Sequence, residues 1–424
     1  MEIPSSLYLC GCGGKPDWER VIKPALKRVN ACQPDTLLSP TEAADVGKLS
    51  RGKNHEWIQR TTVLSSESHR PVEDAQYAVS LSIINSDTQK NFGDFLLDVY
   101  KPLSGVSTPK ILKAHTVLVK NISKPIQIFD YFKTNESSRP RSPVFNLDLI
   151  HSLPKMSPEQ QARVAICNTL NDCYSSGANK LIELYPLIVV PEGEVTTSSV
   201  KDWYESAAPV HTTVRSPQLI KHSGDAWLFG ATVVAQTNTA LPRFRSALSP
   251  GDKILAHRPF GSLATLKARV SADRSTDTVT PCLTRDHAPV GEVLSNYLPP
   301  KPDLFDQSKH VKVATDISGE GIRGLTSWLT QTDLQISKIP LVAPDEIRQG
   351  QTVWRLPDAT VETNGPIVFI GCSSVIELVY KDLEQIEWSD PVVIGTLTDG
   401  NGKLNASNVP RAKNLIETIE EQNI

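Results

Sequence analysis

Residues 310–324 read HVKVATDISGEGIRG, an apolar run that ends at Asp316 and passes into closely spaced glycines. The pattern predicts a strand with Asp316 at its end, directly before a glycine step. A carboxylate in that place is suited to binding a metal ion. The alternative is that Asp316 is the N-cap of a helix over Gly319–Gly321.

A second unusual stretch is residues 9–16, LCGCGGKP, which combines two cysteines, three glycines and a lysine. Glycine permits a positive φ and a close backbone approach. A thiol beside an ammonium group ionises more readily, and the thiolate is the reactive form. The stretch predicts a mobile, phosphate-facing loop that carries a nucleophile. The alternatives are a flexible start with a fortuitous Cys-x-Cys, or a small metal clip.

The chain has 424 residues, 39% of them hydrophobic and 21% charged, with a formal net charge of −3. This length suggests two or three domains. The near-neutral charge gives no reason to expect nucleic-acid binding, and no apolar stretch approaches a membrane span. The seven cysteines are odd in number and scattered, which favours reduced thiols. We therefore expect a cytoplasmic protein without nucleic acid or membrane partners.

Periodicity along the chain predicts a mixture of strands and helices. The strongest helix begins at Ser157 with an N-cap, Pro158 and the carboxylate of Glu159, and ends at Gly177. Other helices are expected at 17–30, from 319, and at 374–387. Strands are expected at 75–84, 94–100, 111–119, 125–132, 144–150, 181–190, 227–236, 253–257, 334–339, 366–372 and 392–397. The order argues for an α/β or α+β fold.

The stretch at 310–324 resembles the Ala-Thr-Asp-(Val/Ile)-(Thr/Ser)-Gly-x-Gly signature of selenophosphate synthetases, members of the aminoimidazole ribonucleotide synthetase-like ATP-binding superfamily. Four further stretches resemble motifs of this family in the family's order, namely 11–15, 168–177, 250–261 and 362–366. The family's first metal motif has only imperfect counterparts, at 73–75 and 97–100. Its Asp-Phe-Phe…Asp-Asp-Pro stretch is represented by 148–150 and 156–158, which lack a carboxylate pair.

The resemblance implies a two-domain α/β fold in which an N-terminal mixed sheet with helices forms a dimer barrel and the C-terminal domain is an α/β sandwich. The implied division is 1–75 as the glycine/cysteine loop and an irregular segment, 76–244 as the ATP-binding, dimerising domain, and 245–424 as the C-terminal domain. It also implies a homodimer.

The implied reaction transfers phosphate from ATP to selenide, with Mg²⁺, and releases AMP and phosphate. The resemblance assigns catalytic roles to Cys12 and Lys15. It assigns cofactor-binding roles to Gly11, Gly13, Gly14, Asn168, Thr315 and Gly319, and metal binding to Asp148, Asp172 and Asp316. The alternatives are a diverged member that uses sulfide or another acceptor, and a catalytically silent nucleotide-binding scaffold.

Several of these residues also have structural interpretations. Asp172 lies near a helix C-terminus, where the helix dipole disfavours an anion, so it has a functional role, a cation partner or a solvated surface position. Asp148 is a metal ligand or a surface carboxylate at a strand end. Asn168 faces the nucleotide or is a buried amide satisfied by a neighbour. Cys10 forms a reversible disulfide with Cys12 or is inert and exposed. The histidines at 115, 151, 222 and 310 are predicted to be structural or superficial.

Overall fold

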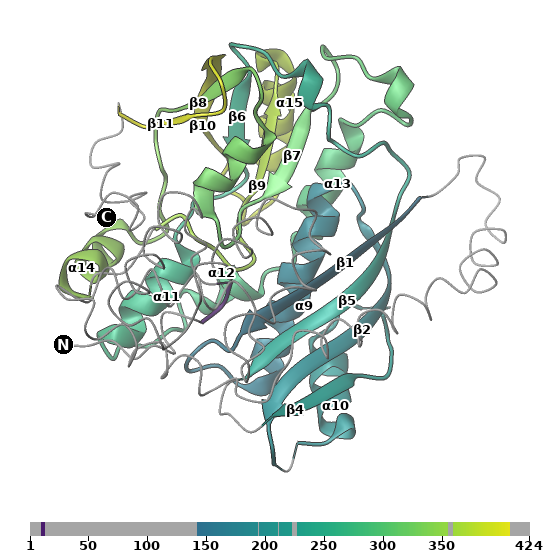
Figure 1. The fold of residues 1–424 in the computed structure, drawn as a ribbon, viewed down its shortest axis with the longest axis vertical. Coiled ribbons are helices and arrows are strands. Elements are labelled where there is room, and N and C mark those ends of the chain that lie inside the picture. Colours follow the sequence, from purple (N-terminus) through teal and green to yellow (C-terminus); the bar gives the residue numbers. More distant parts are fainter. Residues whose placement is uncertain are drawn as a thin grey trace, which may run out of the picture.

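The computed structural model describes residues 10–12, 142–193, 195–210, 212–222, 227–354 and 359–407. Over these residues the chain forms two sheets flanked by helices (Figure 1), which confirms the predicted mixed α/β class. The helix predicted at 17–30, the strands predicted between 75 and 132 and the motif counterparts at 73–75 and 97–100 lie outside the described residues.

The first sheet contains β1 (Ser142–His151), β2 (Lys180–Pro191), β3 (Thr213–Val214), β4 (Gln218–His222) and β5 (Leu228–Thr237). Its order is β1-β5-β2-β3, with β4 also paired to β2, and β5 is antiparallel to both neighbours. Every residue of β5 is buried. A Cβ at Gly230 would lie 2.2 Å from the carbonyl oxygen of Asp148, so this glycine allows β5 to approach β1. The three strands predicted in this region are confirmed.

Helix α9 (Pro158–Ser175) packs on this sheet, against β1 and β5. Its N-terminus has the predicted cap: the Ser157 side chain accepts from the Gln160 N–H, and the Gln160 side chain accepts from the Ser157 N–H at 2.9 Å. Such a capping box satisfies two backbone donors that a helix start leaves without partners. Beyond the helix, Gly177 has a φ of +75°, so the predicted glycine stop is also confirmed.

Helix α10 (Thr197–Ala207) was not predicted, although its signal is in the sequence. Val200, Tyr204 and Ala207 are its buried residues and recur at helical spacing. The Thr196 side chain accepts from the Ser199 N–H at 3.1 Å and so forms the N-cap. The helix covers the same sheet beside α9 (Figure 1).

The second sheet contains β6 (Lys253–Ala256), β7 (Val313–Asp316), β8 (Thr332–Ile336), β9 (Ile367–Gly371), β10 (Val392–Asp399) and β11 (Leu404–Asn405). Its order is β11-β8-β10-β6-β9-β7. Among the described strand pairs of this second sheet, only β11–β8 is parallel. Strands predicted at 253–257, 366–372 and 392–397 are confirmed. The strand predicted at 334–339 ends earlier, because the N–H groups of Ser337 and Lys338 both donate to the carbonyl of Ile394 and the ladder stops.

The helices around the second sheet are α11 (Ser262–Ser271), α12 (Thr280–Thr284), α13 (Ala288–Asn296), α14 (Pro344–Trp354) and α15 (Ser373–Leu383). Short 3₁₀ segments are η5 (Arg245–Ala247), η6 (Pro302–Leu304) and η7 (Gly321–Trp328). The helix predicted from 319 is the 3₁₀ segment η7, which starts two residues later than predicted. Gly321 has a φ of +59°, a backbone conformation that breaks a regular α-helix at this point.

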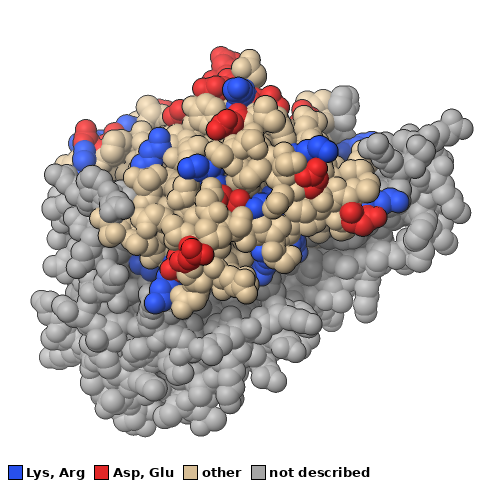
Figure 2. Space-filling view, turned by 90° about the horizontal axis from the view of Figure 1, so that it is seen from above, with Lys and Arg blue, Asp and Glu red and all other residues tan. Residues whose placement is uncertain are grey.

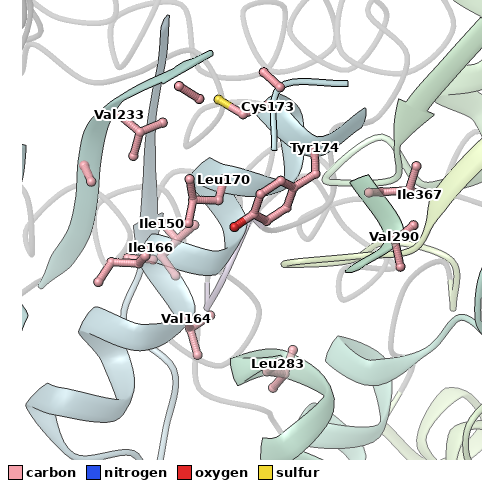
Figure 3. Packing of buried hydrophobic residues seen from close by; sticks show 14 of the residues in the cluster. Ile150, Val164, Ile166, Leu170, Cys173, Tyr174, Val233, Leu283, Val290 and Ile367 are labelled. Carbon is pink, nitrogen blue, oxygen red and sulfur yellow. The ribbon is translucent and has the colours of Figure 1, made fainter. Parts of the chain in front are cut away.

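One buried cluster joins the two sheets through the C-terminal end of α9. Figure 3 shows Tyr174 between two groups of side chains, with Ile150 and Leu170 on one side and Val290 and Ile367 on the other. Both Cys173 and Tyr174 are buried, and α9 also contacts β7 and β9 of the second sheet. The last strand of the first sheet ends at residue 237 and the second sheet starts at 253. A domain boundary at 244/245 stays a prediction.

A buried ion pair links the first two strands of the second sheet. The Nζ of Lys312, just before β7, lies 2.8 Å from Asp252 Oδ1, and Asp252 directly precedes β6. The two side chains are only 1% and 3% exposed. Ser249 supplies further partners, because its N–H donates to Asp252 and its hydroxyl accepts from Lys312. Buried charges are tolerated only when paired in this way, so the Gly-Asp motif at 251–252 has a structural role.

Figure 2 shows Lys and Arg interspersed with Asp and Glu on the face it presents, without a large area of one sign among the described residues. That face therefore offers no extended basic surface to a polyanion. None of the described helices combines the length and the hydropathy of a membrane span.

The buried ion pair gives a stability prediction. Lys312→Met should lower the free energy of unfolding by about 3–5 kcal/mol, because it leaves the Asp252 carboxylate buried without its cation. Lys201→Met is the matched control: Lys201 pairs with Glu205 at 3.4 Å on the surface of α10, where the side chains are 48% and 49% exposed. We expect the control to change stability by less than about 0.5 kcal/mol. Equal urea midpoints for the two variants would contradict the structural role of the pair.

Candidate functional site

Four polar side chains form hydrogen bonds between β1 and α9, with an amide of each element donating to a carboxylate of the other. The Nδ2 of Asn168 donates to Asp148 Oδ2, and the Nδ2 of Asn146 donates to Asp172 Oδ2 at 2.7 Å and to the carbonyl of Thr169 at 2.9 Å. Alternate residues of a strand share a face, as do residues four apart on a helix. Each element therefore presents one amide and one carboxylate to the other. We call these four residues, 146, 148, 168 and 172, the amide–carboxylate ladder.

The ladder brings together three of the predicted site residues. Asn168 is buried, while Asp148 and Asp172 are partly exposed. Asp172 accepts from the Asn146 amide and stays partly exposed, so it is both hydrogen-bonded and in contact with solvent. The Asn168 side chain has hydrogen-bond partners at both ends, as the alternative of a buried amide satisfied by a neighbour requires. Two of these partners, Asp148 and Cys12, are themselves predicted site residues. Asn146 was missed in the sequence analysis; its signal was its position two residues before Asp148 on one strand face.

Cys12 is bound to the ladder. Its Sγ donates to Asn168 Oδ1 at 3.4 Å, and its backbone N–H donates to Thr363 Oγ1 at 2.7 Å. The same Asn168 oxygen accepts from the Asn364 N–H at 2.7 Å. We call Asn168, Thr363 and Asn364 the thiol seat. Cys12 is thus bonded through its backbone to a residue 351 positions away and through its thiol to one 156 positions away.

Gly11 allows this approach. Its N–H donates to the carbonyl of His151 at 3.0 Å and its carbonyl accepts from the His151 N–H at 3.1 Å. Gly11 has a φ of +70°, and a Cβ there would lie 2.3 Å from Thr363 Oγ1. Only glycine therefore fits between the end of β1 and the thiol seat. Residues 10–12 are packed against the end of β1 and the thiol seat, and the mobility of the glycine loop stays a prediction.

Cys10 lies in the interior of the protein. It is fully buried, and burial raises the pKa of its thiol, with the charge of Lys267 acting in the opposite direction. The predicted exposed position is therefore wrong, while Cys10 and Cys12 are not joined by a disulfide in this structure and their reversible disulfide stays a prediction. Cys10 packs in the core cluster that contains Ile150 and Leu153. Gly13, Gly14 and Lys15 lie outside the described residues.

Asp316 is the last residue of β7, as predicted, and lies opposite Ile367 of β9. Burial raises the pKa of the Cys173 thiol, and the negative charges of Asp172 and Asp316 raise it further. Both carboxylates therefore lie close enough to Cys173 to act on it, although Asp172 belongs to α9 and Asp316 to β7 of the second sheet. The structure brings Asp316 to the end of α9 that carries the ladder.

The alternative role for Asp316 as a helix N-cap is wrong. The segment after the glycines is η7, whose N-cap is Glu320, four residues further on, without a side-chain hydrogen bond. Thr315 is partly buried in β7, where its hydroxyl donates to the carbonyl of Asp316 at 3.3 Å, and Gly319 is buried. Both residues lie on the segment that passes the end of α9.

The turn at 362–365 is the base of the thiol seat. The buried Glu362 carboxylate accepts from the N–H groups of Gly261 at 2.5 Å, Ser262 at 3.0 Å and Leu263 at 3.3 Å, at the start of α11. Burial raises the Glu362 pKa, while Arg258 and these N–H groups lower it. The N-terminus of α11 is therefore occupied by a carboxylate of the chain itself, which leaves this helix start closed to an external anion.

Asn364 holds this turn in an uncommon conformation, with a φ of +51°. Its side-chain amide donates to the carbonyls of Leu283 at 3.0 Å and Arg285 at 2.8 Å, and its own carbonyl accepts from Arg258 at 2.7 Å. A Cβ at Gly365 would lie 2.0 Å from the carbonyl oxygen of Ile317. These contacts fix the turn against β7, α12 and the segment after β6.

Two buried histidines below the turn were missed in the sequence analysis. His257 Nδ1 accepts from the Ile367 N–H at 2.8 Å, so its neutral ring carries the proton on Nε2. His287 Nδ1 lies 2.8 Å from Asn171 Oδ1, whose amide donates to the carbonyl of Gly365, so the His287 proton is on Nδ1. Neither Nε2 has a hydrogen-bond partner among the described residues. Burial lowers the pKa of both rings well below 6.5.

Of the histidines named in the sequence analysis, His310 has a structural contact through its ring. His310 Nδ1 accepts from the Asp306 N–H at 2.9 Å, and the His151 backbone bonds Gly11. His222 is the last residue of β4, and His115 lies outside the described residues.

The side chains around the ladder bear on whether the site can bind Mg²⁺. The described residues contain no group of three or more His, Cys, Asp or Glu side chains that could hold a metal ion. Asp148 Oδ1 accepts from the Leu149 N–H at 2.8 Å and its Oδ2 from Asn168, yet each carboxylate oxygen has a second lone pair. Mg²⁺ commonly takes one or two carboxylates and completes its shell with substrate phosphates. The ladder carboxylates fit that use and do not form a closed metal cage.

No protein-family model and no curated protein matches the sequence. Among solved structures, the chain is similar to thiamine-monophosphate kinase from Stenotrophomonas maltophilia K279a, with 14% identity and a TM-score of 0.47 over 63% of this chain and 86% of that one. It is similar to the protein tt0281 from Thermus thermophilus, with 13% identity and a TM-score of 0.49 over 64% and 88%. It is also similar to E. coli HypE, a hydrogenase maturation protein, with 17% identity and a TM-score of 0.47 over 65% and 87%.

The neutral histidine pair gives a pH prediction. A folded pKa below the unfolded value of about 6.5 means that stability is complete above pH 6.5 and falls as the pH drops, by about 1.4 kcal/mol per pH unit for each histidine. His287→Asn keeps a hydrogen-bond donor for Asn171 and replaces the imidazole by an amide that does not take up a proton in this pH range. Urea unfolding at pH 7, 6 and 5 should show a slope smaller by about 1.4 kcal/mol per unit in the variant. Identical slopes would contradict the neutral, buried state of His287.

Proposed function

We propose that this protein is an ATP-dependent phosphotransferase of the aminoimidazole ribonucleotide synthetase-like superfamily that resembles selenophosphate synthetases. The proposed reaction consumes ATP, selenide and water and yields selenophosphate, AMP and orthophosphate. The proposal rests on the five sequence motifs and on how the described parts of these motifs meet in the fold.

The observation that carries the proposal is the double contact of Asn168. Its amide donates to the Asp148 carboxylate and its oxygen accepts from the Cys12 thiol. A soft thiol, suited to a chalcogenide, and a hard carboxylate, suited to Mg²⁺, are therefore held on two sides of one side chain. Asp316, from the motif at 310–324, ends β7, which contacts the same helix.

In the proposed reaction Cys12 holds the chalcogenide and Lys15 neutralises phosphate charge. Asp148, Asp172 and Asp316 would hold Mg²⁺ together with the nucleotide phosphates. The bound ion would supply charge neutralisation for phosphoryl transfer, which depends mainly on positioning and electrostatics. We propose nucleotide contacts for Gly11, Gly13, Gly14, Asn168, Thr315 and Gly319. A homodimer, a cytoplasmic location and a division at 244/245 belong to the same proposal.

A second candidate function is favoured by the ladder itself. Both ladder carboxylates already accept amide hydrogen bonds, and the described residues lack a group of three acidic or soft ligands. A family member that has moved to sulfide or another acceptor, or that binds nucleotide without turnover, would show the same features. The acceptor assay below distinguishes these functions.

Cys12→Ser should abolish AMP formation that depends on the acceptor, because a hydroxyl is a poor ligand for a soft chalcogenide. The full chain with Mg²⁺ and ATP is assayed with selenide, with sulfide and without acceptor. AMP formed only with selenide supports the first function, AMP formed with sulfide supports the diverged member, and nucleotide binding without AMP supports the silent one. Cys282→Ser, at a partly buried cysteine in α12, is the control and should keep the wild-type rate. An unchanged rate in Cys12→Ser would remove the role of Cys12.

Asp316→Asn should weaken the binding of Mg²⁺ with a non-hydrolysable ATP analogue at least about tenfold, since it removes one negative ligand at the end of β7. Calorimetric titration measures the affinity. Asp399→Asn is the matched control, because Asp399 also ends a strand of the second sheet but is exposed. Equal affinities for Asp316→Asn and the wild type would contradict the proposed metal contact.

A further inference from the structure

We propose that Asn168 is a positioning residue that keeps Cys12 docked on the thiol seat as a protonated thiol, so that Cys12 becomes a reactive thiolate only by leaving the seat. This inference deepens the proposed function and rests on it for the role of Cys12 in chemistry. It concerns the state in which the thiol is stored between turnovers, and it is tested without ATP or selenide.

The orientation of the Asn168 amide is determined by two partners besides Cys12. The Asp148 carboxylate can only accept, so the NH₂ end of the amide faces it. The Asn364 backbone N–H can only donate, so the oxygen end faces that group. The atom next to the sulfur is therefore a carbonyl oxygen, and an oxygen at 3.4 Å from Sγ can bond it only if the sulfur carries a proton. The seat thus selects the thiol.

Ionisation of a seated Cys12 would replace this hydrogen bond by the repulsion of a thiolate and a carbonyl oxygen. Charged and titratable groups on the surrounding elements are Asp148 and His151 on β1, Asp172 on α9, Lys267 on α11, and Glu362 with Arg258 at the turn. Lys267 acts on Cys10 and favours its ionised form. Asp148, directly behind the Asn168 amide, opposes a second negative charge. The direct contact at the sulfur decides the sign and favours the protonated thiol.

Departure from the seat is compatible with the other contacts of the segment. Departure breaks the contact of Sγ with Asn168 and the hydrogen bond from the Cys12 N–H to Thr363, and Gly11 has no Cβ that would lock its φ. A seated thiol is protected from oxidation because thiols react far more slowly than thiolates. Release would expose the same sulfur as a thiolate to a soft ligand.

The first experiment measures the alkylation rate of Cys12 by iodoacetamide against pH in the full chain, followed on the Cys12 peptide by mass spectrometry. Asn168→Ala should lower the apparent pKa of the reaction by about one unit, the value of one hydrogen bond to the thiol. Asn171→Ala is the matched control: it removes a buried amide one turn along the same helix that bonds Gly365 and does not contact Cys12. Its midpoint should equal that of the wild type.

An unchanged or raised midpoint in Asn168→Ala would overturn the proposal. An equal fall in Asn171→Ala would also overturn it, because the effect would then be a general loosening of the fold. Circular dichroism confirms that each variant is folded at the pH values used.

A second experiment needs no change at Asn168. Hydrogen exchange of the peptide that contains residues 10–12, corrected for the intrinsic pH dependence, should show protection that is lost as the thiol ionises. Cys12→Ser keeps a donor that does not ionise in this range and should keep its protection. Protection lost at the same pH in both proteins would overturn the proposal. A positive result in both experiments without any AMP formation would refute the proposed function and leave the thiol seat intact.

Discussion

The direction of the two hydrogen bonds made by the Asn168 side chain is the constraint on which the candidate site depends. A carboxylate on one side and a backbone N–H on the other leave the amide a single orientation. That orientation ties the N-terminal thiol, β1 of the first sheet and the 362–365 turn of the second sheet to one helix. Because α9 is buried and capped at its start, it holds these groups at fixed separations.

The motifs at 250–261 and 362–366 stabilise the fold around this arrangement, and other residues would carry out the chemistry. Glu362 satisfies the first N–H groups of α11, and Asp252 neutralises Lys312 in front of β7. Gly365 lets β7 approach the turn. Removal of either carboxylate would leave buried donors without a partner, which costs more than the contact contributes when intact. These residues therefore stabilise the segments that position Asp316 and the thiol seat.

Local signals in the sequence predicted α9 and the strand end at Asp316, since capping residues and an apolar run act through neighbours in the chain. Partners distant in sequence could not be found in this way. Asn146 is an ordinary strand residue until α9 places Asp172 opposite it, and Thr363 is important only because Gly11 approaches its hydroxyl. His257 and His287 lack a spacing pattern, and only the packed fold brings their rings 4.6 Å apart. Such pairings depend on tertiary contacts that a single sequence does not encode locally.

The ladder also bears on how the proposed function would couple metal to nucleotide. Asp148 and Asp172 already accept amide hydrogen bonds, so their negative charge is partly compensated by NH₂ groups before any ion arrives. An ion that met these oxygens alone would lose more hydration than two engaged carboxylates replace, since Mg²⁺ gives up water reluctantly. Phosphate oxygens of ATP would complete the shell. In the proposed function the amides therefore make the nucleotide a condition of metal binding, and the same amide at position 168 also contacts the Cys12 thiol.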